Sequence, residues 1–227
     1  MAGLELNDLN VNNVLNEIRP YIEADGGYLE YVAIDYLKEG PVVMVRMLGA
    51  CAGCDLTSGY KNIAIGPSAA SRLCCGYNNF FAGEYAARCV TTGNLNVAIG
   101  RHAGGFVAAS TGCFYVAFGD RTLCNLTSGG HNVALGMAAG ACATTAGYNI
   151  LMGYGSGYAF GGYATGSDNV FIGRHSGSMN WTTGSHNVGI GRCVFQNMGT
   201  GSYNVAFGVY ALGRTNLSGN NNIAMGR

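Results

Sequence analysis

The sequence predicts a mainly β protein: a β-solenoid (β-roll) of ten repeats of 17–20 residues, preceded by a small N-terminal α+β domain. Three observations lead to this prediction. A five-residue string of the type Asn-apolar-Ala-apolar-Gly recurs ten times after residue 56. Glycine is abundant (38 of 227 residues) and only 11% of residues are charged, which suits short strands joined by tight turns. Residues 1–55 carry nine acidic and three basic side chains, whereas residues 56–227 carry three acidic and nine basic ones. This asymmetry divides the chain into two domains, 1–55 and 56–227.

The ten strings define the repeat. Nine begin with asparagine, the exception being Tyr115, and each ends in glycine. The asparagines are Asn62, Asn79, Asn96, Asn132, Asn149, Asn169, Asn187, Asn204 and Asn222. The glycines are Gly66, Gly83, Gly100, Gly119, Gly136, Gly153, Gly173, Gly191, Gly208 and Gly226. We expect the asparagines to form a structural ladder of side-chain amides and the glycines to turn the chain at positive φ. Ten stacked turns at about 4.8 Å each give a rod of about 50 Å.

The middle residue of each string bears on the oligomeric state. We expect flanking residues such as Val97 and Ile99 to face the interior, so that the middle residue points away from it. Six of the ten middle residues are Ala, although a solvated strand face usually carries polar residues. Small residues there favour close packing of another chain, hence an oligomer. The alternative is a flattened single coil whose own second sheet packs on this face. A small residue three positions after the glycine, as in Ala103, predicts a second short strand.

The repeats resemble two known groups of β-rolls, and the string TTGSHNVGIG at residues 182–191 carries the resemblance best. They are similar to repeats in the heads of trimeric autotransporter adhesins and in bacteriophage tail fibres. Both resemblances imply a homotrimer that builds a shaft or a host-binding surface. The first residues, MAGLELNDLN, lack the basic and apolar regions of a secretory signal. This favours a virion protein, made in the host cytoplasm and acting outside the cell, over a secreted adhesin.

Residues 1–55 have a different pattern. Apolar residues recur at helical spacing over 11–24, with Asn7 or Asp8 as a start and Pro20 as a possible bend. The pattern that follows predicts two strands, at residues 28–34 and 42–48, joined by a turn at 38–41.

Two strings in this segment, EIRPYIEADGG and VRMLGACAGC, resemble the NifU-like domain, an iron–sulfur scaffold module. The resemblance implies that Cys51 and Cys54 are ligands, and that the cysteine pairs of two subunits hold one bridging 4Fe–4S cluster. The family continues past the second cysteine into a helix and a strand, whereas here Asp55 and Leu56 lead into the first repeat. The segment is therefore also interpreted as an attachment or capping domain, whose cysteines form a disulfide or remain free thiols.

Other reactive residues form no evident site. The seven remaining cysteines are interpreted as small buried residues, and His102 and His175 as corner residues four turns apart. Three acidic residues after residue 56 leave little for acid–base catalysis, so we expect no enzyme. The basic residues are too dispersed to predict nucleic-acid binding, and no apolar run is long enough to predict a membrane helix. Four arginines follow strand glycines and either contact an acidic glycan or are simply solvated: Arg101, Arg174, Arg192 and Arg227.

The favoured function is a structural segment of a trimeric phage tail fibre or appendage involved in host attachment. Its partners would be copies of itself, other virion or tail proteins, and a host surface glycan or receptor. The alternative from another class is an iron–sulfur carrier that uses Cys51 and Cys54 and is multimerised by the solenoid. A third alternative, an ice-binding solenoid, fits less well because the Thr residues lie in corners beside Gly.

Overall fold

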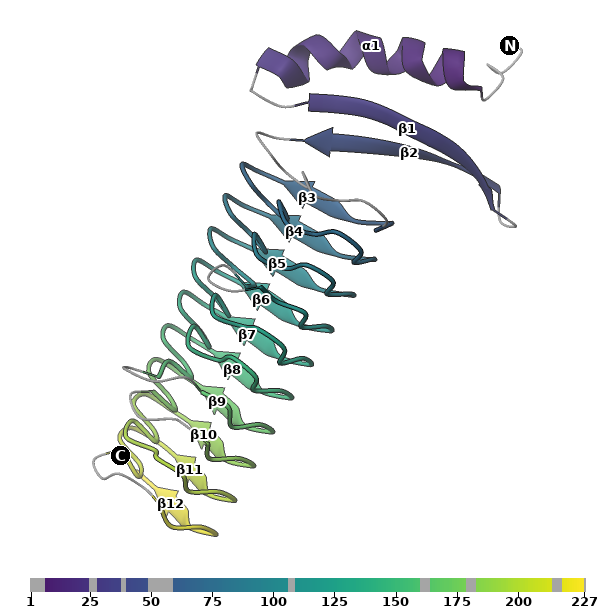
Figure 1. The fold of residues 1–227 in the computed structure, drawn as a ribbon. Coiled ribbons are helices and arrows are strands. Elements are labelled where there is room, and N and C mark those ends of the chain that lie inside the picture. Colours follow the sequence, from purple (N-terminus) through teal and green to yellow (C-terminus); the bar gives the residue numbers. More distant parts are fainter. Residues whose placement is uncertain are drawn as a thin grey trace.

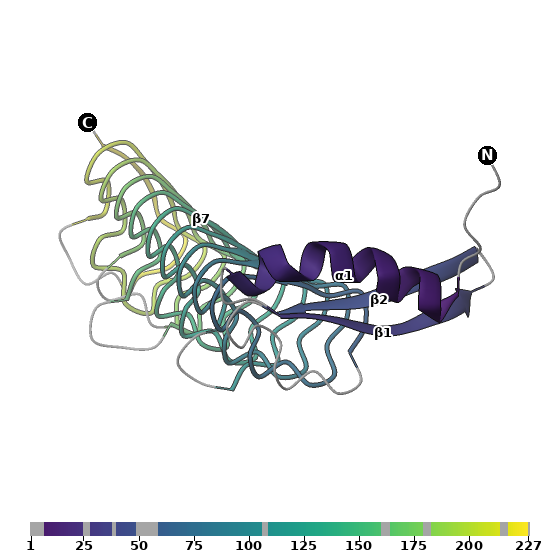
Figure 2. The same cartoon turned by 90° about the horizontal axis from the view of Figure 1, so that it is seen from above.

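The structure is a computed structural model, which describes residues 7–24, 28–37, 40–48, 59–105, 109–159, 164–178, 183–213 and 218–226. A helix and a two-stranded sheet lie at one end of a long stack of turns (Figure 1). Seen from above, the helix α1 runs along the hairpin formed by β1 and β2 (Figure 2). The small α+β unit and the β-solenoid predicted from the sequence are both confirmed.

The helix α1 (Asp8–Ala24) begins and ends where the sequence predicts. Asn10 donates its backbone N–H to Asn7 Oδ1 at 3.0 Å, so Asn7 caps the first turn. Leu15 is buried, and Pro20 lies within the helix. The strands β1 (Tyr28–Leu37) and β2 (Gly40–Leu48) then pair antiparallel, with a register irregularity between Tyr31 and Ala33.

Ten strands of three residues form one parallel sheet in sequence order, and they coincide with the ten predicted strings. Each strand pairs in register with the next, so that Ala117 lies between Ala98 and Ala134. The strands are β3 (Ile63–Ile65), β4 (Phe80–Ala82), β5 (Val97–Ile99), β6 (Val116–Phe118), β7 (Val133–Leu135), β8 (Ile150–Met152), β9 (Val170–Ile172), β10 (Val188–Ile190), β11 (Val205–Phe207) and β12 (Ile223–Met225).

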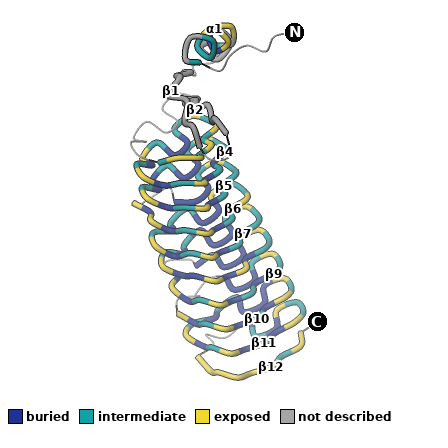
Figure 3. Tube along the Cα trace, turned by 90° about the vertical axis from the view of Figure 1, so that its right-hand side faces the viewer, coloured by how far each residue is buried: buried dark blue, intermediate teal, exposed yellow. Residues whose placement is uncertain are grey.

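The predicted orientation of the strand residues is wrong. In strands such as β5 and β7 the middle residue is buried and the flanking residues are half-buried, so the middle residue faces the interior. Figure 3 shows how buried and exposed segments alternate around the turns. Ala98 is fully buried, whereas Val97 and Ile99 are half-buried. The physical reason is the asparagine that precedes each strand: Asn96 is fully buried, and side chains alternate along a strand, so the residue two positions later shares its face.

The predicted second strand is also absent from the described turns. The small residue three positions after the glycine is buried, as expected, but the residue after it adopts a positive φ, for example 49° at Ala87 and 49° at Leu123. This backbone cannot continue as a strand. It still bonds to the next turn, because Ala87 donates its N–H to the carbonyl of Ala103 at 2.7 Å.

The core is one continuous column along the stack. Its largest fully buried side chains include Tyr115, Phe81, Phe171 and Phe195, separated by many Ala residues. Among the described residues, no buried side-chain nitrogen or oxygen lacks a hydrogen-bond partner. The interior is therefore closely packed and its polar groups are hydrogen-bonded. A functional site is to be sought at the ends, the edges and the outer face of the solenoid.

Candidate functional site

The predicted metal ligands Cys51 and Cys54 lie outside the described residues. The structure places the elements that lead up to them: α1, β1 and β2, the last ending at Leu48. In the described part of the chain, no group of three or more His, Cys, Asp or Glu side chains is placed to hold a metal ion. No described helix has both the length and the apolarity to cross a membrane.

The nine asparagines occupy one column inside the turns. In a typical step, Asn149 donates its backbone N–H and its Nδ2 to Asn132 Oδ1, both at 3.1 Å. The same Nδ2 donates to the carbonyl of Gly166 at 3.1 Å. Asn149 Oδ1 then accepts from the N–H and Nδ2 of Asn169 at 2.9 and 3.1 Å. The side chain of Asn149 thereby joins three consecutive turns within the buried interior.

Tyr115 interrupts this column. Its N–H still donates to Asn96 Oδ1 at 3.1 Å, but its ring fills the interior and its hydroxyl donates to the carbonyl of Gly104 at 3.3 Å. Burial, with a smaller contribution from Cys113, raises the pKa of the Tyr115 hydroxyl far above its usual value. A side chain at position 104 would meet the ring, since a Cβ there would lie 2.8 Å from the Tyr115 hydroxyl oxygen. The absence of a side chain at Gly104 thus accommodates Tyr115.

The strand-closing glycines form a second column. Nine of the ten have positive φ between 100° and 134°, the exception being Gly226. At Gly100 (φ 127°) a Cβ would lie 2.6 Å from the carbonyl carbon of Gly119. The turns stack so closely there that no side chain fits, only the second Cα hydrogen of glycine.

The outer face of the sheet is the largest unusual surface of the described solenoid. It consists of the first and third residue of each of the ten strands, and every one of these residues is apolar. Many are well exposed: Ile65 is 56% exposed and Phe118 is 54% exposed. This surface is not predicted from the sequence, where the same residues are expected to face the interior. Their burial pattern could have been inferred from the Asn two positions before the middle residue.

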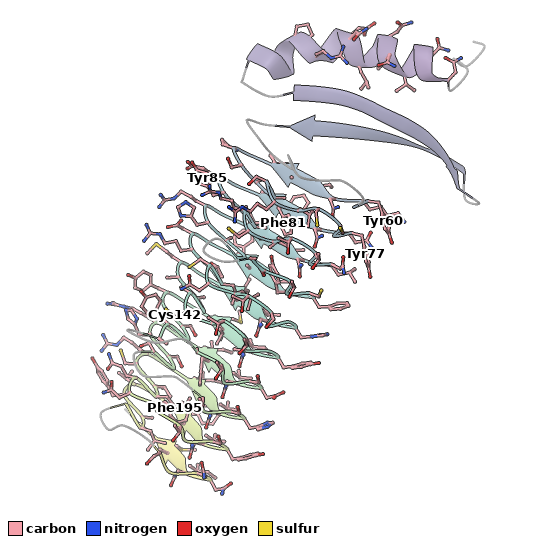
Figure 4. The ribbon with its side chains drawn as sticks, in the orientation of Figure 1. Tyr60, Tyr77, Phe81, Tyr85, Cys142 and Phe195 are labelled. Atoms are coloured by element: carbon pink, nitrogen blue, oxygen red, sulfur yellow. The ribbon has the colours of Figure 1, made fainter. Side chains whose placement is uncertain are left out.

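The two edges of the stack differ in charge. We call the segments one to six residues after each strand glycine the strand-exit edge, and the two residues before each strand asparagine the strand-entry edge. Tyr85 marks the exit edge, and Tyr60 and Tyr77 mark the entry edge (Figure 4). All the described arginines of the solenoid lie on the exit edge: Arg72, Arg88, Arg101, Arg121, Arg174 and Arg192. Three of them were not singled out from the sequence, because they do not directly follow the glycine. The predicted Arg227 lies outside the described residues.

The exit edge carries two acidic side chains, Glu84 and Asp120. Arg101 donates Nε and Nη2 to the two carboxylate oxygens of Asp120 at 3.2 and 3.3 Å. The entry edge instead carries stacked rings, with His131 between Phe114 and Tyr148 at centroid distances of 4.8 and 4.6 Å. The exit edge is therefore the basic one of the two.

The predicted corner histidines lie on the exit edge, on separate turns. Burial, and then the neighbouring Arg101, lower the pKa of His102. Burial, and then Arg174, lower the pKa of His175. His175 packs edge-on against Tyr154 with a centroid distance of 5.0 Å.

The cysteines of the solenoid are less buried than predicted. Cys89 and Cys193 are buried, Cys75 is exposed, and the other four are half-buried. Burial, with Cys142 nearby, raises the pKa of Cys124 to about 11. That thiol stays protonated at neutral pH and is a poor nucleophile and metal ligand.

Comparisons with known proteins concern the N-terminal domain. The NifU-like domain family matches residues 11–60. The chain is 51% identical over 52 residues to NifU-like protein 1, chloroplastic, of Oryza sativa subsp. japonica, covering 22% of this chain and 21% of that protein. It is 45% identical over 49 residues to NifU-like protein 2, chloroplastic, of Arabidopsis thaliana, covering 22% of this chain and 19% of that protein.

The chain thus spans about a fifth of the length of the curated relatives it matches. No solved structure matches it. The resemblance of the first residues to NifU-like domains is confirmed over that span. None of these matches supports the tail-fibre resemblance, which stays a prediction.

Proposed function

We propose that this protein is a structural fibre protein, without catalytic activity, whose solenoid assembles with copies of itself as a homotrimer. The observation that carries the proposal is the outer face of strands β3–β12, which is apolar at both outward positions of every strand. A sheet face exposed to water normally carries polar residues. This face instead has the composition of a surface that packs against another protein surface.

The dimensions of the face support the proposal. Its ten strands span about 43 Å along the rod, and the two columns of side chains are about 7 Å apart. With the width of the side chains added, the patch reaches the size, roughly 300–600 Å², that on monomers is the upper limit and often marks a binding surface. Phe118 and Ile65, each more than half exposed, lie in this patch.

A copy of the same solenoid is the partner that fits best. The occupant has to be straight, apolar and as long as the rod, and another copy has these properties together with the same rise per turn. In a threefold arrangement around the rod axis, each chain has two neighbours. The two outward columns match this geometry, since the column of Val133 would face one neighbour and that of Leu135 the other.

The finer proposal is a segment of a bacteriophage tail fibre or related virion appendage that takes part in host attachment. The repeat strings and the rod shape of the solenoid support it (Figure 1). Residues 1–55 would join the rod to other virion or tail proteins, and the rod would contact a host surface glycan or receptor. Such a protein is made in the host cytoplasm and acts outside the cell.

Sedimentation velocity of the full chain over a range of concentrations tests the proposal. We expect a single species of three times the 23.5 kDa chain mass, and rods in electron micrographs. A monodisperse monomer at all concentrations would refute the fibre function.

A second candidate function is an iron–sulfur scaffold or carrier, favoured by the family match over residues 11–60. Cys51 and Cys54 are two residues apart in the sequence, a spacing at which one turn of chain can present two thiolates to the same metal. Two chains would supply the four thiolates that a 4Fe–4S cluster needs. When bound, the cluster would be the cargo passed to a recipient protein.

Anaerobic reconstitution with iron and sulfide separates the two candidates. The carrier function predicts a brown protein with stoichiometric iron and sulfide, and a C51S/C54S variant of unchanged fold that stays colourless. A colourless wild-type protein, or equal iron in the variant, would exclude the carrier function and leave the fibre function intact.

A further inference from the structure

The strand-exit edge has a charge distribution that the proposed function does not explain. Six arginines and two carboxylates give it a net of four positive charges. The other edge of the described solenoid has Lys61 and Asp168, which cancel. A merely solvated surface has no reason to segregate its cations on one side of the rod.

The C-terminal half of this edge is basic without compensation. Arg174 and Arg192 occupy the same position on consecutive turns, because Cys193 donates its N–H to the Arg174 carbonyl at 3.0 Å. Both side chains are exposed. After Asp120, the sequence contains a single acidic residue, Asp168, and it lies on the opposite edge. The field of these two guanidinium groups is therefore not cancelled by a neighbour, in contrast to Arg101, which is paired with Asp120.

Aromatic side chains flank the two arginines. Arg192 lies over the ring of Tyr210, with its Cζ 5.4 Å from the ring centroid, a cation–π contact that favours this position of the guanidinium. Tyr154 occupies the turn before Arg174, and its ring is 46% exposed. Exposed tyrosines combine an apolar ring face with a polar tip, a combination that suits the alternating C–H and hydroxyl surfaces of sugars.

The identity of the cations and their spacing narrow the class of ligand. All six are arginines, whose planar guanidinium binds carboxylate or sulfate through two parallel hydrogen bonds. The net positive charge along the edge amounts to about one per two and a half turns, or one per roughly 12 Å. A nucleic-acid strand carries one phosphate per about 3.4 Å, which is far denser. A polysaccharide with one acidic group on every sugar or every second sugar is closer in charge density.

We propose that the C-terminal half of the strand-exit edge is a binding surface for an acidic polysaccharide, in which Arg174 and Arg192 bind the acidic groups and Tyr154 and Tyr210 contact the sugar rings. The inference deepens the proposed role in host attachment and rests on it. Its test does not depend on the oligomeric state, because the edge is complete within one chain.

Fluorescence anisotropy of the full chain with labelled oligogalacturonate and dextran sulfate tests the proposal, with neutral dextran as the control ligand. We expect the wild-type protein to bind at least one of the two acidic probes and not dextran, more weakly as salt rises to about 0.15 M. The R174Q/R192Q variant should lose affinity by roughly tenfold or more, which is what the loss of charge-assisted contacts predicts. Carboxylate and sulfate recognition are distinguished by which probe binds more tightly.

Two variants serve as controls. R101Q changes an arginine at the same position of another turn, but one that Asp120 already neutralises, and it should change affinity less than about twofold. R174K/R192K keeps the positive charge but loses the planar guanidinium that makes two parallel hydrogen bonds. Its affinity should lie between those of the wild type and R174Q/R192Q. Circular dichroism checks that each variant is folded.

Absence of binding to both acidic probes, or an equal loss of affinity in R101Q and R174Q/R192Q, would overturn the proposal. Tighter binding to single-stranded DNA than to either polysaccharide would overturn it in favour of nucleic acid. Failure of trimer formation with polysaccharide binding intact would refute the proposed assembly and leave this surface standing.

Discussion

The inner and outer faces of the same ten strands are both apolar, yet they differ in almost every other respect. The inner face carries mostly Ala, and Ala98, Ala117 and Ala134 are fully buried between the Asn column and the turns. The outer face carries larger side chains such as Phe118 and Leu135, which the single chain leaves partly exposed. In these three strands the small middle residues lie in the interior of the coil, and the larger flanking residues form the surface that we propose another chain covers.

The largest effect should come from placing a charge on either face of one strand. Ala134→Glu puts a carboxylate into the packed interior of β7 and should destabilise the chain by at least about 3 kcal/mol, because the charge has no partner there. Leu135→Glu, one residue later, should cost the single chain less than about 1 kcal/mol. Urea unfolding followed by circular dichroism measures both, at protein concentrations low enough for the chain to be monomeric. Equal destabilisation by the two substitutions would contradict the assigned orientation of the strand.

The next effect concerns the residue that replaces Asn in the interior column. Tyr115→Asn would restore the repeat pattern. We nevertheless expect it to destabilise the chain by about 3 kcal/mol, because removal of the ring creates a cavity beside Gly104. Gly104→Ala alone should also be destabilising, because its Cβ would meet the Tyr115 ring. The double variant should cost less than the sum of the two single changes. Strict additivity in a double-mutant cycle would show that the two positions are not coupled.

A smaller effect is expected from alkaline pH, which also acts on the interior. The pKa of Tyr115 is raised by burial in the folded chain, whereas in the unfolded chain it is about 10. The folded state therefore holds this proton more tightly. Its contribution to stability is fully present below about pH 10 and is lost as the pH rises above that value. Urea midpoints at rising pH should fall less steeply for Tyr115→Phe than for wild type, and identical slopes would contradict burial of the hydroxyl.

The smallest effect is expected at the edge, outside both faces. Arg101 is 49% exposed in its ion pair with Asp120, and pairs of this kind contribute roughly 0–1 kcal/mol. Arg101→Gln should therefore leave the thermal midpoint within a few degrees of wild type. A large fall would mean that the ion pair, and not the Asn column, holds β5 and β6 together.

The repeat strings located all ten strands from the sequence, because Asn and Gly each have a position that only they fill well. The orientation of strand residues such as Val97 could not be chosen from apolarity alone, since both faces are apolar. The burial of Asn96 two positions before Ala98 would have settled it. The sequence wrongly predicts strands in the turns after each glycine. Ala87 and Leu123 adopt a positive φ there, which their residue types do not predict. The stacking between turns imposes that conformation.

The candidate sites were predictable to different degrees. The motif at Cys51 and Cys54 was recognised from local sequence, which matches a known family over residues 11–60. The outer face was missed, since its residues look like core residues until the turns are closed. The basic edge was found in part: Arg174 and Arg192 follow their glycines directly, whereas Arg121 joins the edge only through the shape of the turn.

The central claim is that copies of this chain cover the outer face of β3–β12. Light scattering of the wild-type protein and of the double variant F118E/L135E tests it most directly. We expect a trimeric mass for the wild type and, for the variant, a monomeric mass with an unchanged circular dichroism spectrum. A monomeric wild type, or a variant that remains trimeric, would contradict it.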